Sequence, residues 1–425
     1  MDTVYSSQYL TMKDSFTRAG FNVEVAYTPA GDPDHVYEAG RLLAVDRDDT
    51  VQRLQEALPG LRRADPGEQP QIAGSELVVL SIDDVEGGHL TVPEALDRID
   101  EYLGRDNPAL EEDGVPLVTP VHIVHITKLC PAGEPQVPSG YPAQPWPAPA
   151  PAGGGRREVR IGVCDTGFLE NLDRARYPWL ANVDGEADPL GPMLPGDRQG
   201  IPQYAGHGTF AAGVASCMAP GASVYVNNHF TLSGGEREHV IIAKLEQLIQ
   251  DQAPDVVSLS AGTYTRNAWA SLGFSEFAGR HPEITLVAAA GNDGTDRKFY
   301  PAAFKWAVSV GALGADQQHR AWFSNHGDWV DVYALGEGLV NAYATGVYTY
   351  QEPPKRPAKQ SFHGMARWDG TSFATPLVAG LIAAEMAQSG AAAADARNTV
   401  LERAQRHEIN GVGAVLYPPE DGPAA

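Results

Sequence analysis

A proline- and glycine-rich stretch in the middle of the chain sets the strongest limit on how it can fold. Eight prolines lie between residues 131 and 151, and three glycines follow at residues 153–155. Proline lacks the backbone N–H that helices and inner strands need, so no regular element is expected to run through this stretch. We therefore expect two folded units joined by a linker at residues 131–155, semi-rigid at first and ending in a flexible joint.

The unit before the linker alternates between strand-like and helix-like segments. Residues 1–35 have little periodicity and are interpreted as an N-terminal extension. Within residues 36–130, apolar residues at helical spacing follow Thr91, a residue type that often caps helices. The predicted order is a small α/β domain with strands at residues 36–45, 75–82 and 121–126 and helices at residues 49–58 and 91–103.

The unit after the linker, residues 156–420, has a different pattern of apolar residues. Short apolar runs alternate with helical stretches along its length. Such alternation is typical of a doubly wound α/β fold, in which helices cover both faces of a mostly parallel sheet. The strands are predicted at residues 159–164, 223–226, 256–260, 285–290 and 307–310.

The charge of the chain argues against two classes of partner. The formal net charge is −23, and residues 1–155 carry 25 acidic and 10 basic residues, so the first third is a distinct acidic segment. Phosphate backbones and anionic lipid would repel such a chain, so we expect neither nucleic acid nor membrane as partner.

Cysteine usage and the N-terminus together suggest a compartment. The three cysteines cannot form a disulfide framework, and the first twenty residues lack a basic start followed by an apolar run. No apolar run approaches the roughly 20 residues that a membrane span needs. We therefore expect a cytoplasmic protein with reduced thiols.

Four short motifs in the second unit carry possible chemistry. Asp165 ends an apolar strand in the segment VCDTG, and His207 lies between two glycines where a helix is predicted to begin. The strand end is where functional groups collect in open α/β sheets, and a histidine with this much backbone room can act as a general base. Taken singly, Asp165 is more often a turn residue and His207 a capping or core residue.

The other two motifs supply the remaining parts of an acyl-transfer site. Asn292, in AAAGNDG, either tolerates a turn conformation or donates its amide to an oxyanion. Ser372, in GTSFATP, either caps a helix or is a nucleophile next to the free N–H groups of that helix, with Pro376 in its first turn. Together, an Asp that could orient a base, a His, an oxyanion donor and a Ser at a helix start supply every part of an acyl-transfer site.

Taken in this order, the four motifs resemble those of the subtilisin-like serine proteases, and the resemblance covers residues 159–418. It implies that Ser372 attacks a peptide carbonyl, that His207 moves the proton, that Asp165 orients His207, and that Asn292 stabilises the oxyanion. The expected partner is a peptide or protein substrate.

The resemblance also implies two substrate-binding edges, which would bind a peptide as an added strand. One edge contains Ser260, Ala261 and Gly262, and the opposing edge contains Gly234 and Gly235. Glu236 beside that edge either favours basic substrate side chains or is a solvated carboxylate. No cofactor is expected. Calcium often stabilises such proteins, but no acidic cluster has a recognisable ligand spacing, so no metal site is assigned.

Residues 36–130 resemble the N-terminal prodomain of these proteases in size, position and element order. This implies a domain that regulates or inhibits its own active site. Two alternatives stay open: cleavage within residues 131–155 removes the domain, or the domain stays attached and keeps a high effective concentration. A catalytically silent peptide-binding module of the same fold is the rival function, and an esterase is disfavoured because GTSFATP is not a G-x-S-x-G elbow.

Overall fold

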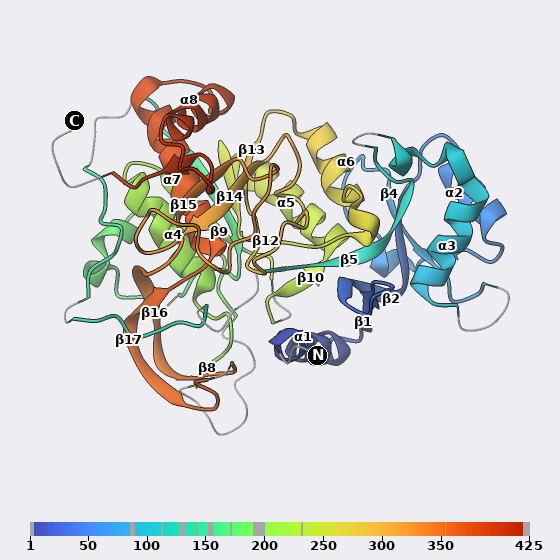
Figure 1. Cartoon of the computed structure of the whole chain (residues 1–425), viewed down its shortest axis with the longest axis horizontal. Coiled ribbons are helices and arrows are strands. Elements are labelled where there is room, and N and C mark those ends of the chain that lie inside the picture. The colour runs from blue at the N-terminus through green and yellow to red at the C-terminus, as the bar shows by residue number, and fades with distance from the viewer. Residues whose placement is uncertain are drawn as a thin grey trace.

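The computed structural model contains two units that lie side by side (Figure 1). We call residues 4–126 the N-terminal domain and residues 156–419 the C-terminal domain. The structure describes residues 4–85, 90–111, 114–126, 133–140, 143–151, 156–170, 172–189, 200–230, 233–352 and 354–419.

The N-terminal domain is an antiparallel sheet covered by helices. Strands follow the order β5-β2-β4-β3, and β1 pairs with the first half of β2. The elements are α1 (Val4–Arg18), β1 (Val23–Tyr27), β2 (Pro33–Val45), α2 (Thr50–Ala57), β3 (Arg62–Arg63), β4 (Leu77–Ser81), α3 (Val92–Leu103) and β5 (Val118–Ile126).

The helix α3 shows why the sequence pattern of this domain was informative. Thr91 is its N-cap, and Thr91 and Glu94 form a reciprocal capping box. Val92, Leu96, Ile99 and Leu103 form the buried face of the helix. By contrast, residues 1–35 showed little periodicity, yet they form α1 and β1, and Met12 and Phe16 of α1 are buried in a small cluster with Val23, Val36 and Ile123.

The C-terminal domain is built on eight parallel strands, as the predicted doubly wound fold requires. Their order is β18-β15-β14-β13-β11-β6-β9-β7. The strands are β6 (Arg160–Asp165), β7 (Val183–Gly185), β9 (Ser223–Asn228), β11 (Val256–Leu259), β13 (Thr285–Ala289), β14 (Val308–Leu313), β15 (Val332–Leu335) and β18 (Val415–Leu416).

Helices pack on both faces of this sheet. Gly162 of β6 faces Leu248 of α5, whereas Asp165, three residues further along the same strand, faces α4. The central helix α7 packs against α4 and against β11, β13, β14 and β15. The helices are α4 (His207–Met218), α5 (Glu238–Gln252), α6 (Leu272–Arg280), α7 (Thr371–Ser389) and α8 (Ala393–Gln405).

Among the described residues, no single helix is long and apolar enough to cross a membrane. The consecutive helices α7 and α8 pass that test only as a pair, and they are bent by 115° relative to each other.

One sheet joins the two domains. The C-terminal domain contributes two short strands, β10 (Gly235–Arg237) and β12 (Ala261–Gly262), and both pair antiparallel with the end of β5. A strand of the N-terminal domain thus lies between two strands of the C-terminal domain. In Figure 1, β5 runs from the N-terminal domain toward β10 and β12.

The proline-rich segment lies against the C-terminal domain instead of spanning open space between the domains. The backbones of Gln136 and Trp146 form bridges to Arg367 and Val340, which belong to a long hairpin of β16 (Leu339–Thr349) and β17 (Lys359–Trp368). A third strand, β8 (Gly200–Ile201), pairs with β16. Because backbone hydrogen bonds attach the segment to the C-terminal domain at two points, it does not act only as a spacer. The flexible joint expected at residues 153–155 lies outside the described residues.

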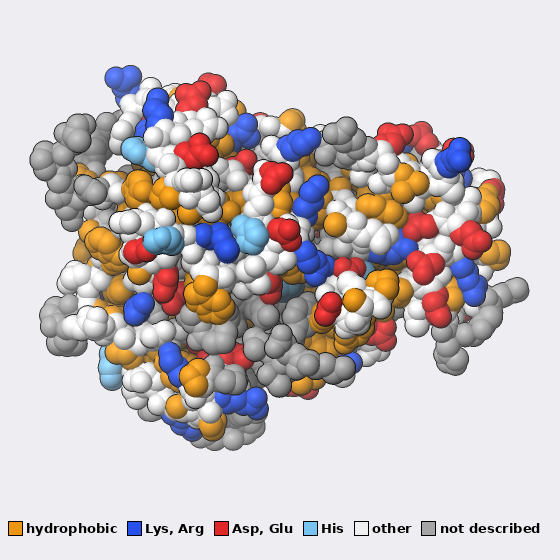
Figure 2. All heavy atoms as spheres, in the orientation of Figure 1, with side chains coloured by type: hydrophobic (Ala, Val, Ile, Leu, Met, Phe, Trp, Pro, Cys, Tyr) orange, Lys and Arg blue, Asp and Glu red, His pale blue; other side chains and the backbone are white. Residues whose placement is uncertain are grey.

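Ion pairs across the domain boundary follow the uneven charge of the sequence. The N-terminal acids Asp34, Asp97 and Asp100 pair with arginines of the C-terminal domain at 2.6–2.7 Å. The reverse arrangement occurs where Arg47 meets Glu276 at 3.2 Å. Figure 2 shows acidic side chains gathered over the region of α2 and α3, with some basic ones between them.

Candidate active site

Asp165 and His207 meet at the carboxyl end of the parallel sheet. Asp165 is the last residue of β6, and His207 is the first residue of α4. The His207 Nδ1 lies 2.7 Å from Asp165 Oδ1 and 2.9 Å from Oδ2, and both side chains are buried. Because Asp165 engages Nδ1, the other ring nitrogen, Nε2, is left for a proton transfer at the opposite edge of the ring.

The glycine after His207 explains how the helix reaches the strand so closely. A Cβ at Gly208 would come within 2.5 Å of the Gly167 carbonyl oxygen and 3.1 Å of the Asp165 Cβ. Any larger residue would therefore push α4 away from β6. The G-H-G-T segment is the sequence signature of this close approach.

A second carboxylate, Asp188, supports the same loop and was not singled out by the sequence. Its Oδ2 accepts hydrogen bonds from the Gly206 N–H at 2.6 Å and from the Thr166 hydroxyl at 3.1 Å. The Thr166 hydroxyl oxygen in turn accepts the Gly208 N–H at 3.1 Å. Burial raises the pKa of Asp188 to about 7. No spacing rule could have identified Asp188, because its partners lie on other segments.

Ser372 is the second residue of α7, next to the free N–H groups of that helix. The expectation for Pro376 was wrong: it lies inside the helix, not in its first turn. Proline has no N–H, so the Ser372 carbonyl, four residues earlier, lacks its helical donor. The Ser260 hydroxyl donates to that carbonyl at 2.8 Å, which ties Ser260 to the start of α7.

Asn292 lies beside Ser372 and is oriented by the residue between Gly370 and Ser372. The Asn292 Oδ1 accepts hydrogen bonds from the Thr371 backbone N–H at 2.9 Å and from the Thr371 hydroxyl at 2.8 Å. These two bonds fix the orientation of the amide, so that its NH₂ group points away from Thr371. That amide nitrogen would lie 3.3 Å from a Cβ built on Gly370.

Aromatic side chains hold the two helix starts together. The His207 ring lies 5.0 Å from the ring of Phe373, the residue that follows Ser372, and 5.2 Å from the ring of Trp368. Phe373, Trp368 and Phe210 are all buried. The structure therefore brings Asp165 and His207 close to the start of α7, where Asn292 and Ser372 lie.

The five predicted substrate-binding residues all lie beside β5. Ala261 pairs with Ile126, and both Gly262 and Gly235 pair with His125 from opposite sides. The Gly234 carbonyl accepts the Ile126 N–H at 2.8 Å. Ser260 is one position before this ladder and bonds Ser372, as described above. The ladder therefore leads from β5 toward Ser372.

The environment of Glu236 differs from a solvated carboxylate. Its exposure is 6%, and its Oε1 accepts the Arg237 N–H at 2.9 Å. The neighbouring Arg237 guanidinium lies 3.8 Å from the ring centroid of Phe21, in the segment between α1 and β1. Residues of the N-terminal domain therefore cover this edge, which the local sequence could not indicate.

The sequence pattern of the subtilase family matches residues 156–414, the region that contains all four motifs. The chain belongs to the subtilase family. It is 30% identical over 267 residues to thermitase of Thermoactinomyces vulgaris, covering 60% of this chain and 83% of the relative. It is also 31% identical over 275 residues to a thermophilic serine proteinase of Bacillus sp. strain AK1, covering 60% of this chain but only 57% of the relative.

Solved structures also resemble this subtilase. One is a cold-adapted subtilisin-like serine proteinase, 20% identical with a TM-score of 0.47, which covers 69% of this chain and 98% of that chain. Halolysin of Haloferax mediterranei is 28% identical over 257 residues, but the match covers only 44% of it. The subtilase therefore spans about half the length of some of the curated relatives that it matches.

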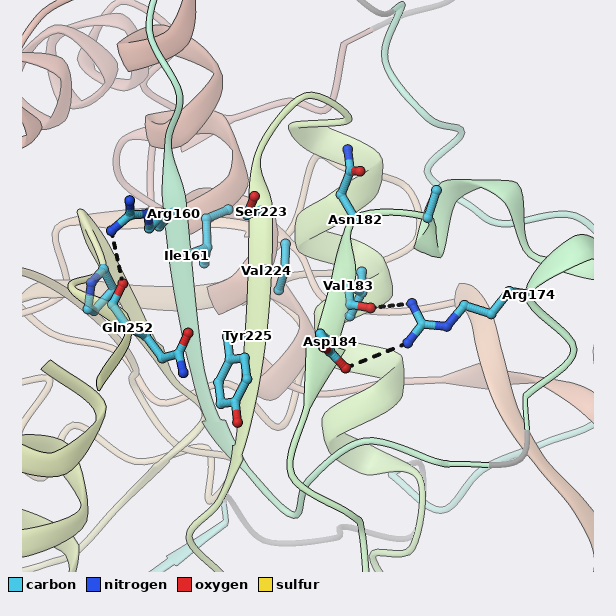
Figure 3. A pocket seen from close by; sticks show the side chains of 12 residues that line it. Arg160, Ile161, Arg174, Asn182, Val183, Asp184, Ser223, Val224, Tyr225 and Gln252 are labelled. Atoms are coloured by element: carbon cyan, nitrogen blue, oxygen red, sulfur yellow. Dashed lines mark hydrogen bonds and ion pairs between the residues drawn. The ribbon is translucent and has the colours of Figure 1, made fainter. Parts of the chain in front are cut away.

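A cavity of about 750 Å³ lies at the other end of the sheet from Asp165 and His207 (Figure 3). It is lined by the amino ends of β6, β9 and β7, where Arg174 contacts the Val183 carbonyl oxygen and lies 3.8 Å from Asp184. Within the described ranges, no group of three or more His, Cys, Asp or Glu residues could hold a metal ion.

Proposed function

We propose that this subtilase is a serine endopeptidase that uses Asp165, His207 and Ser372 as its triad. The observation that carries the proposal is the buried His207 Nδ1 contact with Asp165 at 2.7 Å, next to the α7 start that carries Ser372. The relatives named as serine proteinases support the same reading. The cytoplasmic location and the independence from cofactors stay predictions.

In the proposed mechanism, Ser372 Oγ attacks the substrate carbonyl while His207 Nε2 takes its proton. The negative charge on the carbonyl oxygen is then stabilised by the Asn292 amide and by the N–H groups at the start of α7. His207 gives the proton to the leaving amine. Water then takes the place of that amine: His207 Nε2 accepts a proton from the attacking water and returns it to Ser372 Oγ as the acyl group leaves. Asp165 keeps the His207 ring oriented and stabilises its charged form.

The N-terminal domain has a proposed role at the same site. Its strand β5 fills the place between β10 and β12 that an extended substrate would take. The domain therefore competes with substrate and lowers activity for as long as it is docked. Whether it is later removed is a separate question, which intact-mass measurements on wild-type protein and Ser372→Ala answer: residues 1–155 lost only from the wild type indicate self-cleavage.

Covalent labelling with a fluorophosphonate probe tests the catalytic proposal. We expect Ser372 to be labelled in the wild type and the label to disappear in Ser372→Ala and in His207→Ala. Peptide hydrolysis should fall by at least about 10⁴-fold in both variants, the scale of losses when such triads are broken. A variant that keeps Asp165, His207 and Ser372 but has β5 displaced by Val124→Asp, and that is neither labelled nor active, would support the silent peptide-binding module instead.

A further inference from the structure

The strand β5 shows which side chains a peptide in the cleft would direct toward the C-terminal domain. Residues alternate between faces along a strand, so His122, Val124 and Ile126 share one face. Val124 and Ile126 are fully buried in the main core cluster, which consists mostly of C-terminal residues. Ile123, on the opposite face, packs with Met12 and Phe16 of α1. The side chains of His122, Val124 and Ile126 therefore lie where the side chains of a bound substrate would contact the C-terminal domain.

The third residue of that face, His122, meets a buried carboxylate. The His122 Nδ1 lies 3.0 Å from Glu238 Oε2, and both side chains are fully buried. Glu238 is the first residue of α5 and follows β10 directly. The pair therefore lies at the edge of the cleft, within the C-terminal domain's own substrate-binding region.

The C-terminal domain holds Glu238 in place through its other oxygen. Glu238 Oε1 accepts the Ser271 hydroxyl at 2.6 Å and the Gly273 N–H at 2.7 Å, both at the start of α6. Two helix starts, those of α5 and α6, thus favour a negative charge at this point. Oε2, in contrast, takes its hydrogen bond from the N-terminal domain. Displacement of β5 would leave that oxygen facing the cleft.

We propose that Glu238 is a specificity-determining residue that selects peptides with a basic side chain at the position of His122. This inference rests on the proposed function. A basic side chain would pair with Oε2, an apolar one would leave a buried carboxylate half-paired, and an acidic one would add a repulsive charge. Substrates with Lys, Arg or His at that position are therefore preferred.

The strand register fixes where this position lies relative to the cleaved bond. Ala261 pairs with Ile126, and the next position toward the nucleophile is Ser260, whose hydroxyl bonds the Ser372 carbonyl. Because Ser260 contacts the backbone of Ser372, we assign the cleaved carbonyl to the substrate residue opposite Ser260. The residue aligned with His122 is therefore the fifth residue before the one that carries the cleaved carbonyl.

A set of internally quenched peptides tests the proposal with the full-length protein. The peptides share one sequence with a single cleavable bond and differ only at the fifth residue before the one that carries the cleaved carbonyl, which is Lys, Arg, Ala or Glu. The docked β5 lowers the rate for all peptides by the same factor, so the ratio of kcat/KM between two peptides is independent of docking. Mass spectrometry confirms that each peptide is cut at the intended bond.

We expect the Lys and Arg peptides to be cleaved at least about tenfold faster than the Ala peptide, because a hydrogen bond to a charged group stabilises a complex by an amount that corresponds to about tenfold or more. The Glu peptide should be slowest. In Glu238→Gln the Lys-to-Ala ratio should fall to about one. The matched control is Glu276→Gln, which also removes a carboxylate at the domain boundary but lies outside the cleft, and it should keep the wild-type ratio.

The outcomes separate this inference from the proposed function. Cleavage of no peptide above the level of Ser372→Ala, by the wild type and by Val124→Asp in which β5 is displaced, would overturn the proposed function. Cleavage of all peptides at equal rates by the wild type, or an unchanged ratio in Glu238→Gln, would overturn only the inference. Thermal unfolding of Glu238→Gln checks that the variant is folded, and its Ala-peptide rate supplies an internal reference.

Discussion

The two domains meet at one cleft but contribute to it in different ways. The C-terminal domain contributes a few side chains whose atoms must lie within hydrogen-bond distance, such as the Asp165 and His207 pair at 2.7 Å. The N-terminal domain contributes a strand, apolar contacts and ion pairs spread over several elements. Single substitutions in the C-terminal domain should therefore abolish peptide hydrolysis, whereas single substitutions in the N-terminal domain should only weaken its docking.

After the triad variants themselves, the largest single-residue effect that we predict from this comparison concerns Asn292. Replacing Asn292 by Ala should lower kcat by about 10²–10³-fold, because one oxyanion donor is lost in the transition state. KM should change little, since the donor acts on a charge that the bound substrate does not yet carry. Steady-state kinetics on one quenched peptide gives both values.

The variant also has a diagnostic control. Ser372 of Asn292→Ala should still react with the fluorophosphonate probe, more slowly than in the wild type, while Ser372→Ala should not react at all. If Asn292→Ala raises KM and leaves kcat unchanged, Asn292 binds substrate and is not the oxyanion donor.

The same contrast explains what the sequence could predict. The site motifs were readable because each functional residue needs a special local neighbour, such as Gly208 for the close contact of α4 with β6. The predicted strand that ends at Asp165 and the helix that begins near Ser372 both agree with the structure. A functional residue that requires a particular local backbone conformation can therefore be recognised from the residue types next to it in the sequence.

The residues that the sequence did not identify depend on distant partners. Asp188 bonds Gly206 and Thr166, and Glu238 bonds Ser271 and His122, from segments far away in the chain. The same holds for the proline-rich segment, whose backbone pairs with the β16–β17 hairpin more than 190 residues later. Such contacts arise from tertiary packing, which no local pattern contains.

A buried histidine of the N-terminal domain gives the next prediction, on stability. Burial lowers the pKa of His35 from 6.5 to about 4. Between these two pH values the unfolded chain binds a proton that the folded chain does not, so His35 makes the unfolding free energy fall as the pH falls, by up to about 3 kcal/mol. His35→Gln should remove that loss below pH 6.5, which denaturant unfolding in the Ser372→Ala background measures.

Glu38 provides an opposite control for this measurement. Burial raises the pKa of Glu38 from 4.5 to about 7, so the folded chain binds the additional proton between these pH values. Glu38 therefore makes the unfolding free energy rise as the pH falls toward 4.5, and Glu38→Gln should remove that gain. Parallel pH curves for wild type, His35→Gln and Glu38→Gln would contradict both assignments.

Docking of β5 is tested by placing a charge on its buried face. Val124 is fully buried against the C-terminal domain, so Val124→Asp should weaken docking and raise the rate of peptide hydrolysis by the full-length protein by about tenfold to a hundredfold. Leu110→Asp is the matched control, because Leu110 is 63% exposed on the same domain. Equal rates for both variants and the wild type, per labelled Ser372, would show that β5 does not compete with substrate.

The smallest effect concerns the ion pairs at the domain boundary. Arg266 pairs with Asp97 at 2.7 Å and with Asp100 at 2.6 Å, but Asp97 is 73% exposed, so solvent weakens that attraction. In 1 M salt, where the Debye length is about 3 Å, loss of these pairs should raise full-length peptide hydrolysis by only about two- to fivefold. The double variant Asp97→Asn, Asp100→Asn should respond less to salt than the wild type. If both respond equally, the acidic character of the N-terminal domain does not act through these pairs, and its docking depends on the strand and the apolar contacts.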